Sequence, residues 1–149
     1  MNYVLSLIVL ILDQVSKILV VNYLKDPGEI PIIRNIFHLT YVENRGAAFG
    51  VLQHQRWFFI ILTVLIVGAI IFYFRKHRKY PRAMMIGLSL IIGGAIGNLI
   101  DRVLYGFVID FFDFRVWPVF NIADSAIVIG QILVAYVILK YDKLDQKEM

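Results

Sequence analysis

The sequence predicts an all-α membrane protein of four transmembrane helices, with a small β-rich segment at the outer membrane surface. Hydrophobic residues make up 60% of the 149 residues and charged residues 17%, whereas a soluble domain has roughly 45–50% and about 25%. Four apolar stretches approach the roughly 20 residues that a helix needs to cross a bilayer. The chain has about the length of one domain, so residues 1–149 are expected to form a single membrane domain.

The four spans are expected at residues 3–24, 57–74, 83–100 and 119–139. The second and third contain no charged residue, and the fourth contains one, Asp124. The first is apolar except for a polar group that includes Asp13 and Lys17. A cleaved signal peptide would need a basic start and a small-residue cleavage site. The first stretch has neither, so we expect it to remain in the protein as a span.

The basic residues indicate how the spans are oriented. Residues 75–82 hold five Lys or Arg in eight positions, and residues 140–149 hold three in ten. Residues 25–56 hold four in 32, and residues 101–118 two in 18. Cytoplasmic loops carry the excess of Lys and Arg, so both termini and the basic loop are expected in the cytoplasm. The net charge of +4 is then a signal of topology, and no nucleic-acid partner is expected.

The two outer segments have the character of strands. Residues 37–44 (FHLTYVEN) are rich in aromatic and β-branched residues with partial alternation, which favours a strand. Residues 105–114 (YGFVIDFFDF) have the same character, and Pro27, Gly28 and Pro31 interrupt the chain before the first strand. Such aromatic, amphiphilic segments are expected at the boundary between membrane and water.

Ionisable groups inside spans are candidates for a functional site. Asp13 and Lys17 are four residues apart on the first helix and share a face. Two interpretations stay open for this pair: an ion pair that fixes helix packing, or a direct part in chemistry. The absence of cysteine excludes disulfides and thiolate chemistry.

The third span combines small and polar residues. Gly93 and Gly97 have the G-x-x-x-G spacing that allows helices to approach closely. Asn98 and Arg102 are four residues apart at the outer end, so they can reach the same neighbour. Arg102 could be an interfacial anchor, but together with Asn98 it indicates a polar site.

Two acids flank one short outer segment, Asp110 in an apolar run and Asp124 one turn into the fourth span. They can therefore meet near the outer surface. Asn121 and Asp124 also resemble a capping box, which would explain Asp124 but not Asp110. Asp113, three residues along the predicted strand, is expected on the opposite face and in solvent.

Two close carboxylates cannot both ionise easily, so one keeps its proton. The ionised carboxylate can activate a water molecule while the protonated one donates to a carbonyl under attack, which hydrolyses an amide. This chemistry requires no metal or cofactor, and the H-E-x-x-H spacing of metalloproteases is absent. Ser89 follows a Gly-Leu pair, as in some membrane serine proteases, but no histidine occurs in a later span.

Two other classes of protein remain open on these residues. A small proton-coupled transporter or channel also uses membrane carboxylates, at staggered depths through the bilayer. An assembly factor without enzymatic activity could use the glycine face to bind partner helices. The position of the acids near one surface favours hydrolysis.

Five motifs together resemble the bacterial lipoprotein signal peptidase family, also called signal peptidase II. Chain length and number of spans match that family as well. The motifs are Asp13-Gln14-Val15-Ser16-Lys17, Asn44-Arg45-Gly46-Ala47-Ala48-Phe49-Gly50, Gly93-Gly94-Ala95-Ile96-Gly97-Asn98-Leu99-Ile100-Asp101-Arg102, Val108-Ile109-Asp110-Phe111 and Phe120-Asn121-Ile122-Ala123-Asp124.

The resemblance implies an aspartic endopeptidase of the bacterial cytoplasmic membrane. Such an enzyme cuts the signal peptide from a prolipoprotein just before a cysteine that carries a diacylglyceryl group. The resemblance makes Asp110 and Asp124 the catalytic pair, near the extracytoplasmic surface. It assigns substrate-binding or supporting roles to Asp13, Lys17, Asn44, Gly94, Asn98, Arg102 and Asn121. Because the glycines near Gly94 have no side chains, we also expect them to let the substrate backbone approach closely.

The same resemblance implies the partners. These are prolipoproteins with a diacylglyceryl-cysteine, membrane lipids, and the antibiotic globomycin as an inhibitor. The protein is expected to be a monomer without a cofactor.

Overall fold

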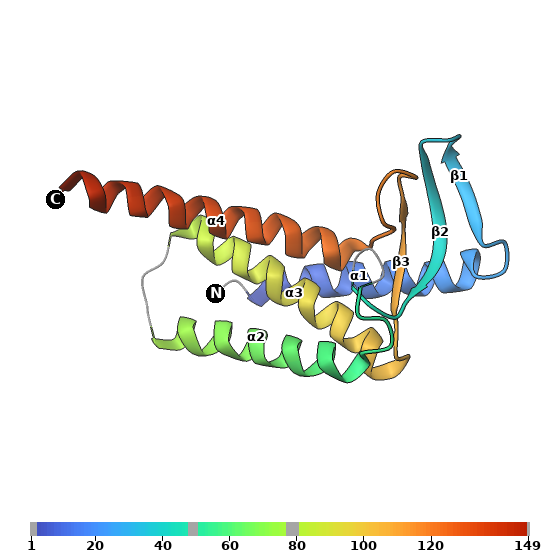
Figure 1. Cartoon of the computed structure of the whole chain (residues 1–149), viewed down its shortest axis with the longest axis horizontal. Coiled ribbons are helices and arrows are strands. Elements are labelled where there is room, and N and C mark those ends of the chain that lie inside the picture. Colours follow the sequence, from blue (N-terminus) through green and yellow to red (C-terminus); the bar gives the residue numbers. More distant parts are fainter. Residues whose placement is uncertain (1–2, 48–50, 77–80, 149) are drawn as a thin grey trace.

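The computed structural model describes residues 3–47, 51–76 and 81–148, and it contains four long helices and a small sheet (Figure 1). All four helices are long and apolar enough to cross a membrane, which confirms the four predicted spans. The helices are α1 (Tyr3–Leu24), α2 (Arg56–Lys76), α3 (Arg82–Leu104) and α4 (Ile122–Glu148), and the strands are β1 (Glu29–Ile33), β2 (Phe37–Asn44) and β3 (Val108–Asp113).

The helix boundaries differ little from the predicted ones, except in the fourth span. Helix α4 begins at Ile122 rather than at residue 119 and continues to Glu148, although its apolar part ends at Lys140. It starts late because Asn121 caps it: the backbone N–H of Asp124 donates to Asn121 Oδ1 at 2.8 Å. The capped end fixes where the chain turns from the segment after β3 into helix α4.

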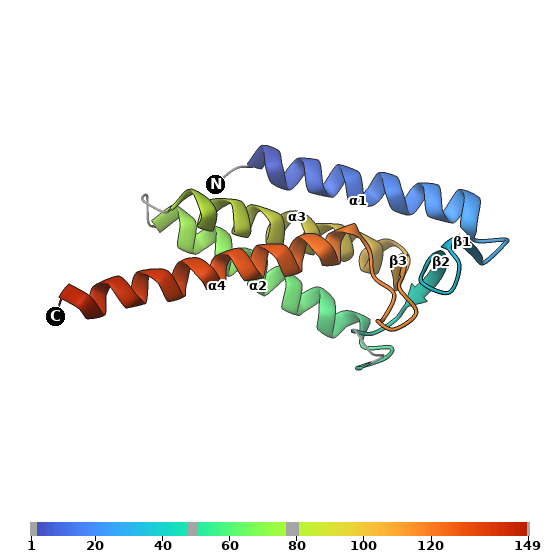
Figure 2. The same ribbon diagram turned by 90° about the horizontal axis from the view of Figure 1, so that it is seen from above.

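Helix α3 lies at the centre of the bundle, between α1 on one side and α2 on the other (Figure 2). Glycines allow this close packing. A Cβ atom added to Gly93 would lie 2.7 Å from the Ser6 carbonyl oxygen of α1, and one added to Gly87 would lie 2.8 Å from the Gly130 carbonyl oxygen of α4. The prediction that the glycines bring helices together is confirmed.

The sheet is antiparallel with the order β1-β2-β3, and it lies at the end of the bundle away from both termini (Figure 1). The predicted strand at residues 37–44 is β2, and residues 108–113 of the second predicted segment form β3. Strand β1 was not predicted, because the sequence EIPII contains a proline and all five residues are exposed. An exposed edge strand lacks the alternation that identifies a half-buried one.

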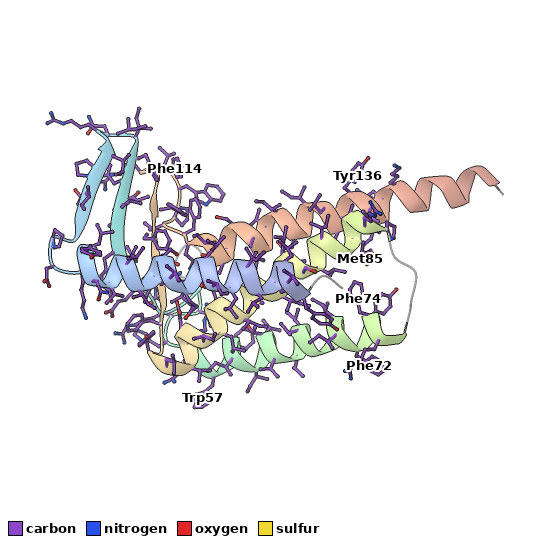
Figure 3. All side chains as sticks on the ribbon, turned by 180° about the vertical axis from the view of Figure 1, so that it is seen from behind. Trp57, Phe72, Phe74, Met85, Phe114 and Tyr136 are labelled. Atoms are coloured by element: carbon purple, nitrogen blue, oxygen red, sulfur yellow. The ribbon has the colours of Figure 1, made fainter. Side chains whose placement is uncertain are left out.

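The outward surface of the helices is apolar. Trp57 and Phe72, 69% and 71% exposed, project outward from α2 (Figure 3). Exposed large hydrophobic residues also run along α1 and α4. In a chain with four membrane-spanning helices, this surface is the one that faces lipid.

The expectation that Asp113 faces solvent is wrong. Its side chain is buried, 6% exposed. Thr40 donates a hydrogen bond to Asp113 Oδ2 at 3.1 Å, and Arg115 Nη1 lies 3.2 Å from the same oxygen. Strand alternation predicts which residues share a face, but it does not reveal that the loop after β3 folds back and covers the second face.

Candidate active site

Asp110 and Asp124 both line one cavity of about 730 Å³ between α2, α3 and α4. Asp110 lies in β3, with 1% of its surface exposed, and Asp124 lies in the first turn of α4. Strand and helix are held together at this point, since the backbone N–H groups of Phe111 and Phe112 donate to the Phe120 carbonyl at 3.0 and 2.8 Å. The structure therefore brings the two predicted acids to one site.

Asp110 accepts hydrogen bonds on both of its carboxylate oxygens. Asn121 Nδ2 donates to Oδ1 at 2.7 Å, and Asn44 Nδ2 donates to Oδ2 at 2.9 Å. Burial, and next the negative charge of Asp124, raises the pKa of Asp110 to about 7, although the two amides and the charge of Lys17 act in the opposite direction. Burial and the neighbouring charge therefore favour the protonated form of Asp110.

Asp124 is held by an amide and by the backbone. Asn98 Nδ2 donates to Asp124 Oδ1 at 2.7 Å, and the backbone N–H of Asn121 donates to Oδ2 at 3.3 Å. Together with the bond from the Asp124 N–H to Asn121 Oδ1, this is a reciprocal capping box. The capping interpretation is thus confirmed, and Asp124 lines the cavity as well.

Asn98 and Asn121 link the two acids from behind. Asn121 Nδ2 donates to Asn98 Oδ1 at 3.1 Å as well as to Asp110. Lys17 Nζ also donates to Asn98 Oδ1 at 3.0 Å. Because the amide oxygen of Asn98 is occupied by these donors, its Nδ2 group is directed at Asp124.

Lys17 lies at the centre of a buried cluster behind the acids, and its side chain is 2% exposed. Its Nζ atom contacts Asp13 Oδ2 at 2.9 Å, Asp101 Oδ2 at 2.8 Å and Asn98 Oδ1 at 3.0 Å. An ammonium group has three donors, and each has an acceptor here. The ion pair on α1 therefore extends to α3 rather than staying within one helix.

The same cluster holds the two elements that carry the acids. Asp101 Oδ2 accepts the Ile109 N–H at 3.1 Å, next to Asp110 in β3. Asp13 Oδ1 accepts the Ala123 N–H at 3.0 Å, next to Asp124 in α4. The geometry favours the supporting interpretation of Asp13 and Lys17. Asp13 contacts the backbone next to Asp124, Lys17 contacts Asn98, and neither residue lines the cavity.

Asp101 is the buried residue that sequence reasoning missed as a site candidate. It is 1% exposed, and Gln14 Nε2 donates to its Oδ1 at 3.1 Å. An acid next to Arg102 at the end of a span resembles an ordinary interfacial charge. The available signal was its spacing, because Asp101 lies three residues after Asn98 and therefore shares its helix face.

Arg102 lies in the cavity wall near the acids. Its Nη2 group donates to the Gly46 carbonyl at 3.2 Å, and its guanidinium lies over the Phe59 ring at 4.7 Å. Asn44 Oδ1 accepts the Gly46 N–H at 2.9 Å. The start of the loop after β2 is thus held by two of the predicted site residues.

Gly94 does not open onto the cavity. A Cβ atom at this position would collide with the Ala123 carbonyl of α4 and would lie 2.9 Å from Ile127 Cγ1. The space beside Gly94 is therefore filled by α4, and the expectation that a substrate backbone approaches there is wrong. Gly94 supports the site by letting α3 meet α4 next to Asp124.

The nine predicted site residues divide into two groups. Asn44, Asn98, Arg102, Asp110 and Asp124 line the cavity. Asp13, Lys17, Gly94 and Asn121 lie behind them in the protein. Among the described residues, no three His, Cys, Asp or Glu side chains are placed to hold a metal ion.

Comparison with known proteins supports one family. A model of the family described as "Signal peptidase (SPase) II" matches residues 5–140. A lipoprotein signal peptidase of Halothermothrix orenii is 49% identical over 97% of this chain and 99% of its own, and one of Clostridioides difficile is 53% identical over 95% and 97%.

A solved bacterial membrane enzyme has a TM-score of 0.86 and 38% identity, covering 92% of this chain and 86% of its own. A second such structure has a TM-score of 0.82 at the same identity, covering 92% and 91%. The chain therefore belongs to the signal peptidase II family, the bacterial lipoprotein signal peptidases.

Proposed function

We propose that this enzyme cleaves the signal peptide from lipid-modified prolipoproteins with a water molecule activated between Asp110 and Asp124. The ionised carboxylate accepts a proton from the water as its oxygen attacks the scissile carbonyl carbon. The protonated carboxylate donates to the carbonyl oxygen. Collapse of the tetrahedral species breaks the C–N bond, and the leaving amine takes up a proton from the pair.

The observation that carries this proposal is that the two acids share one cavity and, among the described residues, have no cation as a direct hydrogen-bond partner. Both line the same cavity, and their direct hydrogen-bond donors in the described residues are amides and backbone N–H groups. With the pKa of Asp110 raised to about 7 by burial and by the charge of Asp124, the pair can hold one proton at neutral pH. This is the state that acid–base hydrolysis requires.

The cavity wall supports a lipid-modified substrate. Much of this wall consists of apolar side chains, including Phe59 and Ile66 of α2 and Val128 of α4. A signal peptide forms an apolar helix that can lie against this wall, and acyl chains can remain in the bilayer. The cut then falls just before the cysteine that carries the diacylglyceryl group.

The remaining residues take supporting parts in this proposal. Asn44 and Asn121 orient Asp110, and Asn98 orients Asp124. Arg102 fixes the loop at Gly46 over the cavity. Asp13, Lys17 and Gly94 hold α1, α3 and α4 together behind the acids.

A proton-coupled transporter would need acids at several depths. Every acid within the four spans belongs to the site: Asp13 bonds to the start of α4, and Asp101 bonds to β3. Toward the other end, residues 3–12, 57–74, 83–100 and 125–139 contain no Asp or Glu. The chain therefore offers no carboxylate path across the bilayer.

We place the enzyme in the bacterial cytoplasmic membrane as a monomer, with the sheet and the acids on the extracytoplasmic side. The sheet lies opposite to both termini (Figure 1), and the basic segment 75–82 indicates the cytoplasmic end. Because the chain has no cysteine, single cysteines report topology cleanly. A membrane-impermeant thiol reagent should label Arg34→Cys in intact cells and should not label Arg75→Cys; the reverse pattern contradicts this orientation.

The test of the activity uses purified protein in detergent. It should release the signal peptide from a precursor that carries the diacylglyceryl group, and globomycin should inhibit the release. The same precursor without the lipid is the matched control and should be cleaved far more slowly. Equal cleavage of the two precursors, or of neither, contradicts the proposed substrate.

A further inference from the structure

Gln131 is a polar side chain in the middle of a membrane span, on the face of α4 that lines the cavity. It lies midway along the apolar part of α4, Ile122–Lys140. Asp124, Val128 and Gln131 share one helix face, since their spacing is that of successive turns. Gln131 therefore lies about 10 Å deeper than Asp124, at 1.5 Å per residue.

The amide of Gln131 has no hydrogen-bond partner among the described residues, and the residue is exposed. Its surroundings in the cavity are apolar. Ile66 of α2 and Ile91 of α3 line the same wall, and Ile91 packs beside Gly130, the neighbour of Gln131. An amide without a partner in hydrocarbon is costly, so this position requires a partner from outside the chain.

A second polar group lines the same cavity. Thr63 of α2 lines the cavity, and it too has no hydrogen-bond partner among the described residues. Thr63 and Gln131 each lie about two helical turns inside the outer end of their helix. This part of the cavity lining is thus apolar apart from these two polar groups.

We infer that Gln131, with Thr63, binds a hydrogen-bonding side chain of the substrate's signal helix and so gives the enzyme a preference among prolipoproteins. This inference rests on the proposed function. The occupant is the signal helix because the cavity is continuous with the two acids. A helix that fills this cavity up to the acids would lie beside Gln131.

The depth predicts which substrate residue is bound. A segment covers about 10 Å with about seven residues if it is helical and about three if it is extended. The bound side chain therefore lies about three to seven residues before the scissile bond. Threonine and valine have nearly the same shape, so exchanging them tests the hydrogen bond alone.

The experiment compares precursors that carry Thr or Val at each of these positions in turn. At one of them the enzyme should cleave the Thr precursor with a kcat/KM about three- to twenty-fold higher than the Val precursor, the range of hydrogen bonds between membrane helices. The difference should lie in KM. In Gln131→Met this ratio should fall to about one, while Ile132→Met, on the lipid-facing side, should keep it.

The possible results separate the two proposals. If the enzyme cleaves no lipid-modified precursor, the proposed function fails. If it cleaves Thr and Val precursors equally at every position, or if Gln131→Met keeps the preference, only the assignment of Gln131 is overturned. Disulfide cross-linking of Gln131→Cys between two copies in the membrane would overturn it too, by showing that a second copy occupies this face.

Discussion

The site contains two pairs of buried acids that lie close together and have opposite surroundings. Asp13 and Asp101 share the Lys17 ammonium, at 2.9 and 2.8 Å. Asp110 and Asp124 have no such cation as a direct partner among the described residues; they receive amide and backbone N–H groups and line an open cavity. Burial alone does not make an aspartate reactive. The difference is that one pair is neutralised within the protein and the other is left with a proton to share.

The largest effect should follow from removing the charge of either cavity acid. Asp110→Asn or Asp124→Asn should lower the cleavage rate at least about 10³-fold, because the group that activates water or donates the proton is lost. The rate is measured on a lipid-modified precursor in detergent. Asp113→Asn, also buried but away from the cavity, is the matched control and should retain most activity. Substantial cleavage by either of the first two variants would remove that residue from the catalytic pair.

Breaking the neutralised pair should act first on stability. Lys17→Met leaves Asp13 and Asp101 buried without their cation, which should cost about 3–5 kcal/mol. The measurement is the unfolding temperature in detergent, followed by tryptophan fluorescence. Lys25→Met, at an exposed position over the Tyr41 ring, should change it little. An unchanged unfolding temperature in Lys17→Met would show that the cluster does not hold the site together.

A smaller effect is expected from removing the hydrogen bond that the Asn44 amide donates to Asp110. The hydrogen bond from Asn44 lowers the pKa of Asp110, so Asn44→Ala should raise that pKa further. The limb of the pH–rate profile that belongs to Asp110 should then move to higher pH, with a rate loss of about tenfold or more at the optimum. Asn22→Ala, on the exposed side of α1, is the control. A profile that stays in place while the rate falls would mean that Asn44 acts only on the substrate.

The fold was largely predictable because membrane spans need long apolar stretches, and nothing else in this chain resembles them. The capping box at Asn121 and Asp124 could also be read locally, since cap and helix are adjacent in sequence. Strand β1 could not be predicted in this way, because all five of its residues are exposed and therefore show no alternation of polar and apolar positions. Its partner strand β2 decides its conformation.

The site was predictable where its residues lie on one element or flank one short segment. Asp101 was missed because its partner, Lys17, lies 84 positions earlier on another helix, and Lys17 already had a local partner in Asp13. The burial of Asp113 was missed for the same reason, since Arg115 and Thr40 approach it from a loop and another strand. Spacing reveals neighbours along one element, whereas the contacts that separate the two acid pairs are made between elements.

The most direct test of this contrast is the stability of Asp110→Asn as a function of pH. The native pKa of Asp110 is raised from 3.8 to about 7, so between these values the folded state binds more protons than the unfolded state. Stability due to this group is therefore present below pH 4 and is lost as the pH rises through 7, at about 1.4 kcal/mol per pKa unit.

Replacing Asp110 with the neutral amide should remove that loss. The variant should have the same unfolding temperature as the wild type near pH 4, a higher one at pH 8, and no cleavage activity. An unfolding temperature below that of the wild type at pH 8 would contradict the account, because Asp110 would then stabilise the fold as Asp13 and Asp101 do.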